Sequence, residues 1–282
     1  MTIPTFQDSC EDILHYYQST DESERLQREE SELELLRTRE ILARFLPPVP
    51  AEVLDVGGGP AVHSLWLAEL GYRTHLVDLV PRHIQQARAL ERVSPAPLIS
   101  CSIGDARRLE FSSNSMDADL LLGPLYHLLE RDDRLQALRE ARRTLRPGGT
   151  LIVQGISRYA ALLKVLTRGH LDDLRMIYVA HHTTRCGQHR PGRGQDFFTT
   201  AYFHHPSELR QELVQAGFRH LVTLGVEGPA RLCGDEFSRH WRDPFTREWL
   251  LDLARSLESE PHLLGISGHL MAVAVKPGQE GR

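Results

Sequence analysis

The sequence predicts an α/β fold built on a doubly wound, mostly parallel sheet. Between Glu52 and Gln154, short apolar runs alternate with stretches that have the length and apolar spacing of helices. This alternation indicates βαβ units, whose right-handed crossovers place the strands in one parallel sheet. The first run ends at Asp55 and the glycine cluster 57–59, where a buried strand turns sharply into a helix. The 282 residues suffice for one large domain of this class with additions.

Residues 8–46, which precede the first strand, are expected to be helical with a break at Ser19–Glu22. Prolines at positions 47, 48 and 50 then end the helical segment. Two interpretations stay open: a solvated helix packed on the edge of the domain, or a lid over the glycine turn. In the lid, three side chains would face inward: Tyr16, Tyr17 and Arg37.

Five core strands and the helices between them are expected next. The strands are Glu52–Val56, Thr74–Val77, Leu98–Ser102, Met116–Gly123 and Thr150–Gln154. The first helix ends at Gly71, and the second starts at Pro81, whose missing N–H is harmless in a first helical turn. The last helix, 132–145, stops at a turn formed by Arg146–Gly149.

The regular alternation stops beyond Gly155. Residues 156–205 hold a helical stretch near 159–179 and a loop rich in glycine, arginine and histidine, which we interpret as an inserted cap. Helices at 206–216 and 243–257 and strands at 220–225 and 269–275 then follow. The predicted organisation is a helical lid (1–50), a cofactor-binding core (51–155), the cap (156–205) and the completion of the core sheet (206–282).

The composition disfavours several classes of protein. No apolar run is long enough for a membrane-spanning helix, and the N-terminus lacks a signal pattern, so a cytoplasmic location is expected. The formal charge of −5 argues against a large nucleic-acid interface. The four cysteines are scattered without a C-x-x-C pair, which favours reduced thiols over disulfides or a zinc site.

Four sequence elements together resemble one family. Asp55-Val-Gly-Gly-Gly-Pro-Ala61 is similar to the first motif of class I S-adenosylmethionine (SAM)-dependent methyltransferases, which have a Rossmann-like fold. Asp78 resembles the acid that ends the family's second strand. Gly104–Ala106 resembles the segment whose acid binds the adenine, and Leu145–Val153 resembles the turn before the family's fifth strand. The resemblance implies SAM as the cofactor, S-adenosylhomocysteine as the product, and a seven-stranded sheet of order 3-2-1-4-5-7-6 whose seventh strand is antiparallel.

The resemblance also implies which residues hold the cofactor. Gly57 and Gly59 would let the backbone approach the methionine part, and Asp78 would accept hydrogen bonds from both ribose hydroxyls. Asp105 would accept from the adenine amino group, while Asp55 would anchor turn amides or, through water, the cofactor's ammonium. A helix-cap role is the alternative for Asp78 and Asp105. The full set is Asp55, Gly57, Gly58, Gly59, Asp78, Leu79, Asp105, Ala106 and Leu122.

One position departs from the family pattern. Ala61 stands where the third glycine is usual, and its small side chain still permits a close approach. A nicotinamide dinucleotide would instead require glycine at the position of Val62, which disfavours a dehydrogenase.

The loop after the fourth strand, residues 123–128, supplies the candidate catalytic residues. It is expected at the carboxyl edge of the sheet, beside the transferable methyl group, so Tyr126 and His127 are the first choices. A base is needed only where the acceptor must lose a proton, and His127 packed under the cap is the alternative. Expected pocket residues are Tyr17, His182, Phe198, Tyr202, His204 and Glu227. Core packing for the aromatic residues and a turn role for Glu227 are the alternatives.

The sequence therefore predicts a methyltransferase that acts on an O, N or activated C atom of a small molecule, in secondary metabolism. No H-E-x-x-H pattern is present, so no metal is expected. One alternative is a peptide, protein or RNA methyltransferase, although Gly123–Tyr126 matches the N/D-P-P-Y/F tetrapeptide poorly. Another is a non-catalytic SAM-binding regulator. The expected partner is a small-molecule methyl acceptor, neither membrane nor nucleic acid is expected, and a homo-oligomer stays open.

Overall fold

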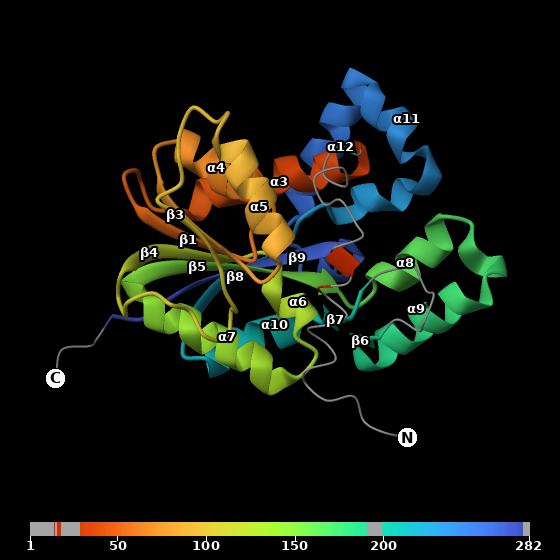
Figure 1. Ribbon diagram of the computed structural model, residues 1–282. Helices are drawn as coiled ribbons and strands as arrows, with labels where there is room; N and C mark the ends of the chain where they lie inside the picture. Colours follow the sequence, from red (N-terminus) through yellow and green to blue (C-terminus); the bar gives the residue numbers. More distant parts are fainter. Residues whose placement is uncertain (1–13, 15, 18–28, 191–198, 279–282) are drawn as a thin grey trace.

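A nine-stranded sheet forms the centre of the protein in a computed structural model that describes residues 14, 16–17, 29–190 and 199–278 (Figure 1). Five parallel strands lie in the order β3-β2-β1-β4-β5. Their bounds are β1 Glu52–Val56, β2 Arg73–Asp78, β3 Ser100–Ile103, β4 Met116–Leu121 and β5 Leu145–Ser157. Next to β5 lies β9 (His269–Val275), which is antiparallel, and β8 (Arg219–Gly225) pairs with β9. The expected order 3-2-1-4-5-7-6 with an antiparallel seventh strand is thus confirmed.

Two short strands add to the expected seven. β7 (Ala201–His204) lies parallel to the end of β5 at Ile156 and Ser157, and β6 (Gln188–His189) pairs with β7. They attach the segment interpreted as a cap directly to the sheet, at the carboxyl ends of the parallel strands.

Helices cover both faces of the sheet (Figure 1). One layer holds α3 (Glu29–Phe45), α4 (Val62–Glu69) and α5 (Pro81–Glu91), and the other holds α7 (Arg131–Thr144) and α10 (Pro206–Gln215). Their buried apolar side chains pack on alternate residues of the strands, and each fully buried leucine contributes about 2 kcal/mol. The remaining helices are α6 Pro124–His127, α8 Ala160–Thr167, α9 Leu174–Cys186, α11 Phe237–Arg242 and α12 Pro244–Leu257, with 3₁₀ segments His170–Asp172, Gly228–Glu236 and Leu264–Ile266.

The helix α3 is a buried part of the fold rather than a solvated helix. Ile41 and Leu42 are fully buried in the core cluster that includes Ile152 of β5. Arg37 is 1% exposed and pairs with Glu258, which follows α12. The solvated interpretation of this helix is therefore wrong.

Two predicted boundaries also differ from the structure. The turn expected at Arg146–Gly149 belongs to β5, because Gly148 and Gly149 exchange backbone hydrogen bonds with Lys276 at the end of β9. The helix expected over 159–179 is broken at Gly169, whose φ of 63° is left-handed, and α9 starts anew after Asp173. Asp173 caps α9 by accepting from the Arg175 and Met176 amides.

The helices α8 and α9 form a lobe beside the sheet (Figure 1). Apolar residues of both helices pack against Ile156 of β5 and Phe203 of β7. Among the described residues, no helix has the length and apolar character needed to cross a membrane.

Candidate functional site

The glycine turn after β1 has three backbone positions that require unusual conformations. Gly57, Gly59 and Ala61 have φ values of 71°, 59° and 71°. A Cβ on Gly57 would lie 2.7 Å from the ring of Pro124, whereas a Cβ on Gly59 would meet nothing within 4 Å. Gly59 therefore faces open space. Ala61 holds a left-handed conformation that costs an L-residue about 1–2 kcal/mol, which explains why glycine is usual there.

Asp55 lies beneath the glycine turn and is 1% exposed. Its Oδ2 accepts a hydrogen bond of 2.6 Å from the Ser64 hydroxyl, while its buried Oδ1 has no partner among the described residues. Burial, with a smaller effect of the Asp78 charge, raises the pKa of Asp55 to about 6. A Cβ on Gly58 would lie 2.4 Å from Asp55 Oδ2, so the second glycine makes room for this carboxylate.

Asp78, at the end of β2, holds the glycine turn. Its Oδ2 accepts from the Gly59 amide at 2.8 Å, and its Oδ1 accepts from the Val80 amide at 2.8 Å and from His83 Nδ1 at 3.0 Å. A carboxylate has about four lone-pair positions, so one on Oδ2 stays available to a ligand. The Val80 bond closes a two-residue turn before α5, whose N-cap Val80 has no side-chain cap bond, so the structure does not support the helix-cap alternative for Asp78.

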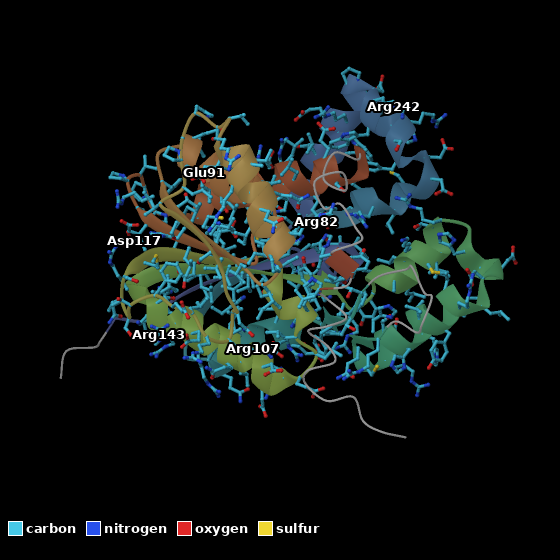
Figure 2. All side chains as sticks on the ribbon, viewed as in Figure 1. Arg82, Glu91, Arg107, Asp117, Arg143 and Arg242 are labelled. Carbon is cyan, nitrogen blue, oxygen red and sulfur yellow. The ribbon has the colours of Figure 1, made fainter. Side chains whose placement is uncertain are left out.

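Asp105 follows β3 at the same edge. The Gly104 amide donates to the Asp78 carbonyl at 3.0 Å, which places the two acidic segments side by side. Arg107 (Figure 2) binds the Asp105 carboxylate through its guanidinium and its backbone amide, and also lies 3.5 Å from Asp133 of α7. Although burial opposes ionisation, these bonds hold the pKa of Asp105 below its usual range.

His127, at the end of α6, contacts two distant parts of the chain. The Tyr17 hydroxyl lies 2.9 Å from His127 Nε2, and the Thr200 carbonyl lies 3.3 Å from Nδ1. A carbonyl only accepts, so Nδ1 carries the proton and Nε2 accepts from Tyr17. Burial lowers the pKa of His127 to about 4, so the ring is neutral at pH 7.

Tyr17 lies between the cofactor edge and the candidate catalytic residues. Its ring centroid is 5.0 Å from that of His83, the partner of Asp78, and 5.5 Å from that of His127. Tyr126 packs edge-on to His127 at 4.7 Å and against the apolar cluster of α8 and α9. The structure thus brings Tyr17, Tyr126 and His127 together.

Tyr202 and His204 lie in a buried ionic network on β7. Arg134 of α7 stacks 3.6 Å from the Tyr202 ring centroid and binds Glu212 of α10 at 2.8 Å. His204 is fully buried, with Nε2 3.4 Å from Glu212. These contacts join β7 to both helices of one layer.

One other predicted pocket residue, His182, lies elsewhere. His182 is on the exposed side of α9, where it stacks on Tyr178 and has Nε2 3.2 Å from the sulfur of Cys186. Phe198 lies outside the described residues.

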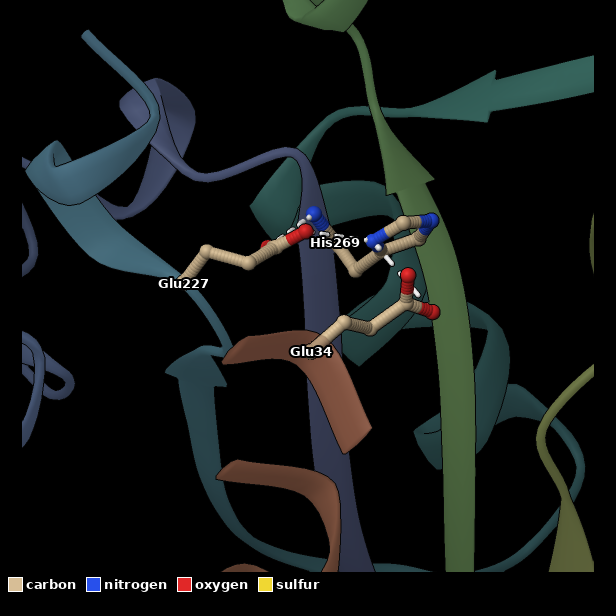
Figure 3. Close-up of side chains that lie close together, drawn as sticks. All are labelled: Glu34, Glu227 and His269. Carbon is tan, nitrogen blue, oxygen red and sulfur yellow. Dashed lines mark hydrogen bonds and ion pairs between the residues drawn. The ribbon is translucent and has the colours of Figure 1, made fainter. Parts of the chain in front are cut away.

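Glu227, which follows β8, belongs to a cluster with His269 of β9 and Glu34 of α3 (Figure 3). Its Oε1 is 2.7 Å from His269 Nδ1, and its Oε2 accepts from the Ser267 hydroxyl and the His269 amide, both at 2.9 Å. Arg231 lies 3.2 Å from Oε1. Burial opposes ionisation, yet the charges of His269 and Arg231 hold the pKa of Glu227 below its usual range.

Sequence reasoning missed several residues of the site: Glu34, His83, Thr200 and His269. The position of His83, five residues after Asp78 and on the first turns of the following helix, was the one available signal. Glu34 and His269 carry no local pattern because their partners are distant in the chain.

Comparison with known proteins identifies a methyltransferase domain in the chain. A family model described as a methyltransferase domain matches residues 54–153, which contain the glycine turn, Asp78 and Asp105. This part of the chain is a methyltransferase domain, and its motifs resemble those of the class I SAM-dependent family. The sheet order 3-2-1-4 brings the segments that carry the family motifs to one edge of the sheet.

The relatives cover only part of the chain. Methyltransferase GfsG of Streptomyces halstedii is 30% identical over 146 residues, which are 50% of this chain and 48% of GfsG. The UbiE C-methyltransferase of Nitrosospira multiformis, described as acting in ubiquinone/menaquinone biosynthesis, is 33% identical over 111 residues, 38% of this chain and 43% of UbiE. The chain thus spans less than half of the length of the curated relatives it matches.

Solved structures share the fold of this chain. A SAM-dependent methyltransferase of Methanosarcina mazei matches with a TM-score of 0.58 at 18% identity, over 85% of this chain and 98% of the other. The [4+2]-cyclase SpnF matches with a TM-score of 0.56 at 19% identity, over 87% and 81%. At these identities the likeness concerns the fold alone.

Proposed function

We propose that the protein transfers a methyl group from SAM to an O, N or activated C atom of a small molecule, in secondary metabolism. The observation that carries this proposal is the convergence of the glycine turn, Asp78 and Asp105 at one edge of the sheet, beside Tyr126 and His127. The membership of residues 54–153 in a methyltransferase family supports it.

The residues at this edge fit SAM. Gly59 has open space where a side chain would stand, so a ligand can approach its backbone. The unpartnered Oδ1 of Asp55 is suited to the cofactor's ammonium, directly or through water. Asp78 keeps one lone pair for a ribose hydroxyl, and Asp105 can accept from the adenine amino group beside Arg107. Leu79, Ala106 and Leu122 would provide apolar contacts.

Bound SAM supplies a methyl group on a positively charged sulfur, which is a strong electrophile without help from the protein. The residues of the chain must therefore align the acceptor in line with that methyl and exclude water. Tyr126 and His127 follow β4 and would line the position of the acceptor. Tyr17, through its bond to His127, would cover it.

A small acceptor is favoured because distant segments meet over the edge. Tyr17 comes from the N-terminal segment and Thr200 from the segment before β7, and both contact His127. A protein or RNA acceptor would need an open face at this place. The fold itself does not decide the reaction, since the same fold occurs in a [4+2]-cyclase.

Calorimetry with S-adenosylhomocysteine tests the cofactor assignment. Asp78→Ala should weaken binding by about 1–3 kcal/mol, the scale of a lost hydrogen bond to a charged group. Asp117→Ala is the matched control, because Asp117 lies at the opposite end of β4 and pairs with Arg146. Equal affinity of the Asp78 variant and the wild-type protein would remove Asp78 from the site.

Turnover separates the three classes of function. SAM is incubated with the protein and a panel of small hydroxylated, amino and enolic compounds, and S-adenosylhomocysteine is measured. Turnover with a compound of the panel supports the proposal. Tight binding of SAM without turnover on the panel, on peptides or on RNA would instead indicate a SAM-binding regulator.

A further inference from the structure

His269 is placed at the same edge and face of the sheet as the candidate acceptor position. It is the first residue of β9, and because β9 is antiparallel, its start lies at the carboxyl ends of the parallel strands. His269 stands opposite Ile156 of β5, and directly opposed residues point to the same face. Ile156 packs in the cluster that contacts Tyr126. His269 therefore lies one strand, roughly 5 Å, beyond β5 on the side of the predicted acceptor.

The ring of His269 is held in one orientation. Nδ1 lies 2.7 Å from Glu227 Oε1 and 3.7 Å from Glu34 Oε1, and Figure 3 shows the second ring nitrogen pointing away from both carboxylates. Because an ionised carboxylate only accepts, Nδ1 carries the proton and Nε2 holds the lone pair in the neutral ring.

The other ring nitrogen of His269 is open. Nε2 has no hydrogen-bond partner within the described part of the chain. The fully buried polar atoms without a partner do not include it, so Nε2 is at least partly exposed. The exposed 17% of the side chain thus includes this nitrogen. A buried carboxylate that orients an imidazole with an open Nε2 is the arrangement of a general base.

The charged groups around His269 favour its protonated form. Glu34 faces it from α3, Glu227 from the segment after β8, and Arg231 from the 3₁₀ segment that follows. Although burial and Arg231 oppose protonation, the two carboxylates raise the pKa of His269 above its usual value. A base is most effective when its pKa lies near the working pH.

His127 has the opposite character. Burial lowers its pKa to about 4, and its Nε2 already accepts from Tyr17. A proton would therefore bind His269 in preference to His127.

A divalent cation in the cluster is less favourable, although its three ligand types would suit one. Both oxygens of Glu227 already accept hydrogen bonds from His269 and Ser267, and Arg231 lies within 3.2 Å of it. Once His269 is protonated, the positive charges of His269 and Arg231 balance the negative charges of Glu34 and Glu227.

We propose that His269 Nε2 takes the proton of a hydroxyl acceptor during methyl transfer, with Glu227 and Glu34 as positioning residues. This inference rests on the proposed function. The acceptor oxygen forms a bond to the methyl carbon, the carbon–sulfur bond breaks with its electron pair passing to sulfur, and the O–H proton passes to Nε2. A neutral amine already has a free lone pair and needs no base before it attacks, so this proposal takes the acceptor class to be an alcohol or a phenol.

The first test is a titration of the histidine side chains by NMR in the presence of S-adenosylhomocysteine. The signal of His269 is identified by its absence from His269→Asn. It should titrate above 6.5, with the proton of the neutral ring on Nδ1, and Glu227→Gln should lower its pKa. Should Glu227→Gln fail to fold, Glu34→Gln gives the same comparison. A His269 that titrates below 6.5, or that carries its proton on Nε2, overturns the proposal.

The second test compares phenols that differ in acidity as methyl acceptors. His269→Asn should reduce turnover of a phenol that is protonated at the assay pH roughly 10²–10⁴-fold. It should have much less effect on a nitrophenol that is already ionised. The exposed His262→Asn is the matched control and should leave both rates unchanged. Equal losses on both phenols, or turnover of amines alone, would overturn the proposal.

The two proposals fail in different ways. If the wild-type protein does not bind S-adenosylhomocysteine, the proposed function is wrong, whatever the behaviour of His269. If it binds the product but methylates amines alone, the proposed function holds and the assignment of His269 as the base is wrong.

Discussion

The hydroxyl of Tyr17 lies 2.9 Å from Nε2 of His127, although 110 positions separate the two residues in the chain. This bond connects the N-terminal segment to the helix that follows β4. It leaves His127 with partners on both ring nitrogens, because Nδ1 donates to the Thr200 carbonyl. The pair therefore joins segments that are distant in the chain next to the end of β4.

The Tyr17–His127 bond can be tested through the titration of the histidine. Tyr17 donates to the neutral form of His127, so its hydroxyl helps to keep the pKa of that ring low. Tyr17→Phe should raise the pKa of His127 above the present value of about 4, as measured by NMR. An unchanged pKa would mean that the bond is not formed in solution. The double variant Tyr17→Phe, His127→Ala should lose no more turnover than His127→Ala alone, because the two residues act as one unit.

Two glycines of the turn should respond differently to substitution: Gly59 should affect ligand binding, and Gly57 should affect stability. Gly59→Ala meets no neighbour within 4 Å, so it should cost about 1–2 kcal/mol of stability from its positive φ. It should nevertheless weaken S-adenosylhomocysteine binding, because the new methyl fills the open space. Gly57→Ala should be more destabilising, since its Cβ would lie 2.7 Å from Pro124. Urea denaturation and calorimetry measure the two effects, and a Gly59 variant with full affinity would contradict the site.

Asp119 should make stability depend on pH. It is fully buried in β4, and burial raises its pKa to about 8, partly offset by the Thr144 hydroxyl. Its folded pKa exceeds the unfolded value, so its contribution is fully present below pH ~4 and is lost as pH rises towards 8. Asp119→Asn should therefore be more stable than wild type at pH 9, by more than ~1.4 kcal/mol, the equivalent of one pKa unit. Equal denaturation midpoints of the two proteins at pH 9 would refute this expectation.

The buried pair of Arg134 and Glu212 should be essential for the attachment of β7. Glu212→Ala leaves the Arg134 guanidinium buried at 2% exposure without its carboxylate, which should destabilise the protein by about 3–5 kcal/mol. Replacing both residues, as Arg134→Met with Glu212→Leu, should recover much of that loss because no charge is left unpaired. Thermal or urea denaturation provides the measurement. A single variant as stable as wild type would show that the pair contributes little.

The central fold follows from the sequence because its signals are local. Apolar runs of strand length, Gly71 and Pro81 at helix ends and the glycine turn each specify a few residues, and together they indicate the βαβ units. The boundaries were less accurate where distant partners decide them. The segment Arg146–Gly149 reads as a turn but pairs with Lys276, and the sequence predicts no strand at Ala201–His204, which pairs with β5.

The sequence by itself determined the edge of the sheet that we propose binds the cofactor, since Asp55, Gly59 and Asp78 lie within a few residues of strand ends. The order of parallel strands then necessarily gathers them. Only the tertiary structure decided the acceptor side. Tyr17 meets His127 across 110 positions and Glu227 meets His269 across 42, and no periodicity encodes such pairs. Their contact depends on how α3, β7 and β9 pack on the sheet. Burial there lowers the pKa of His127, whereas the carboxylates of Glu34 and Glu227 raise that of His269.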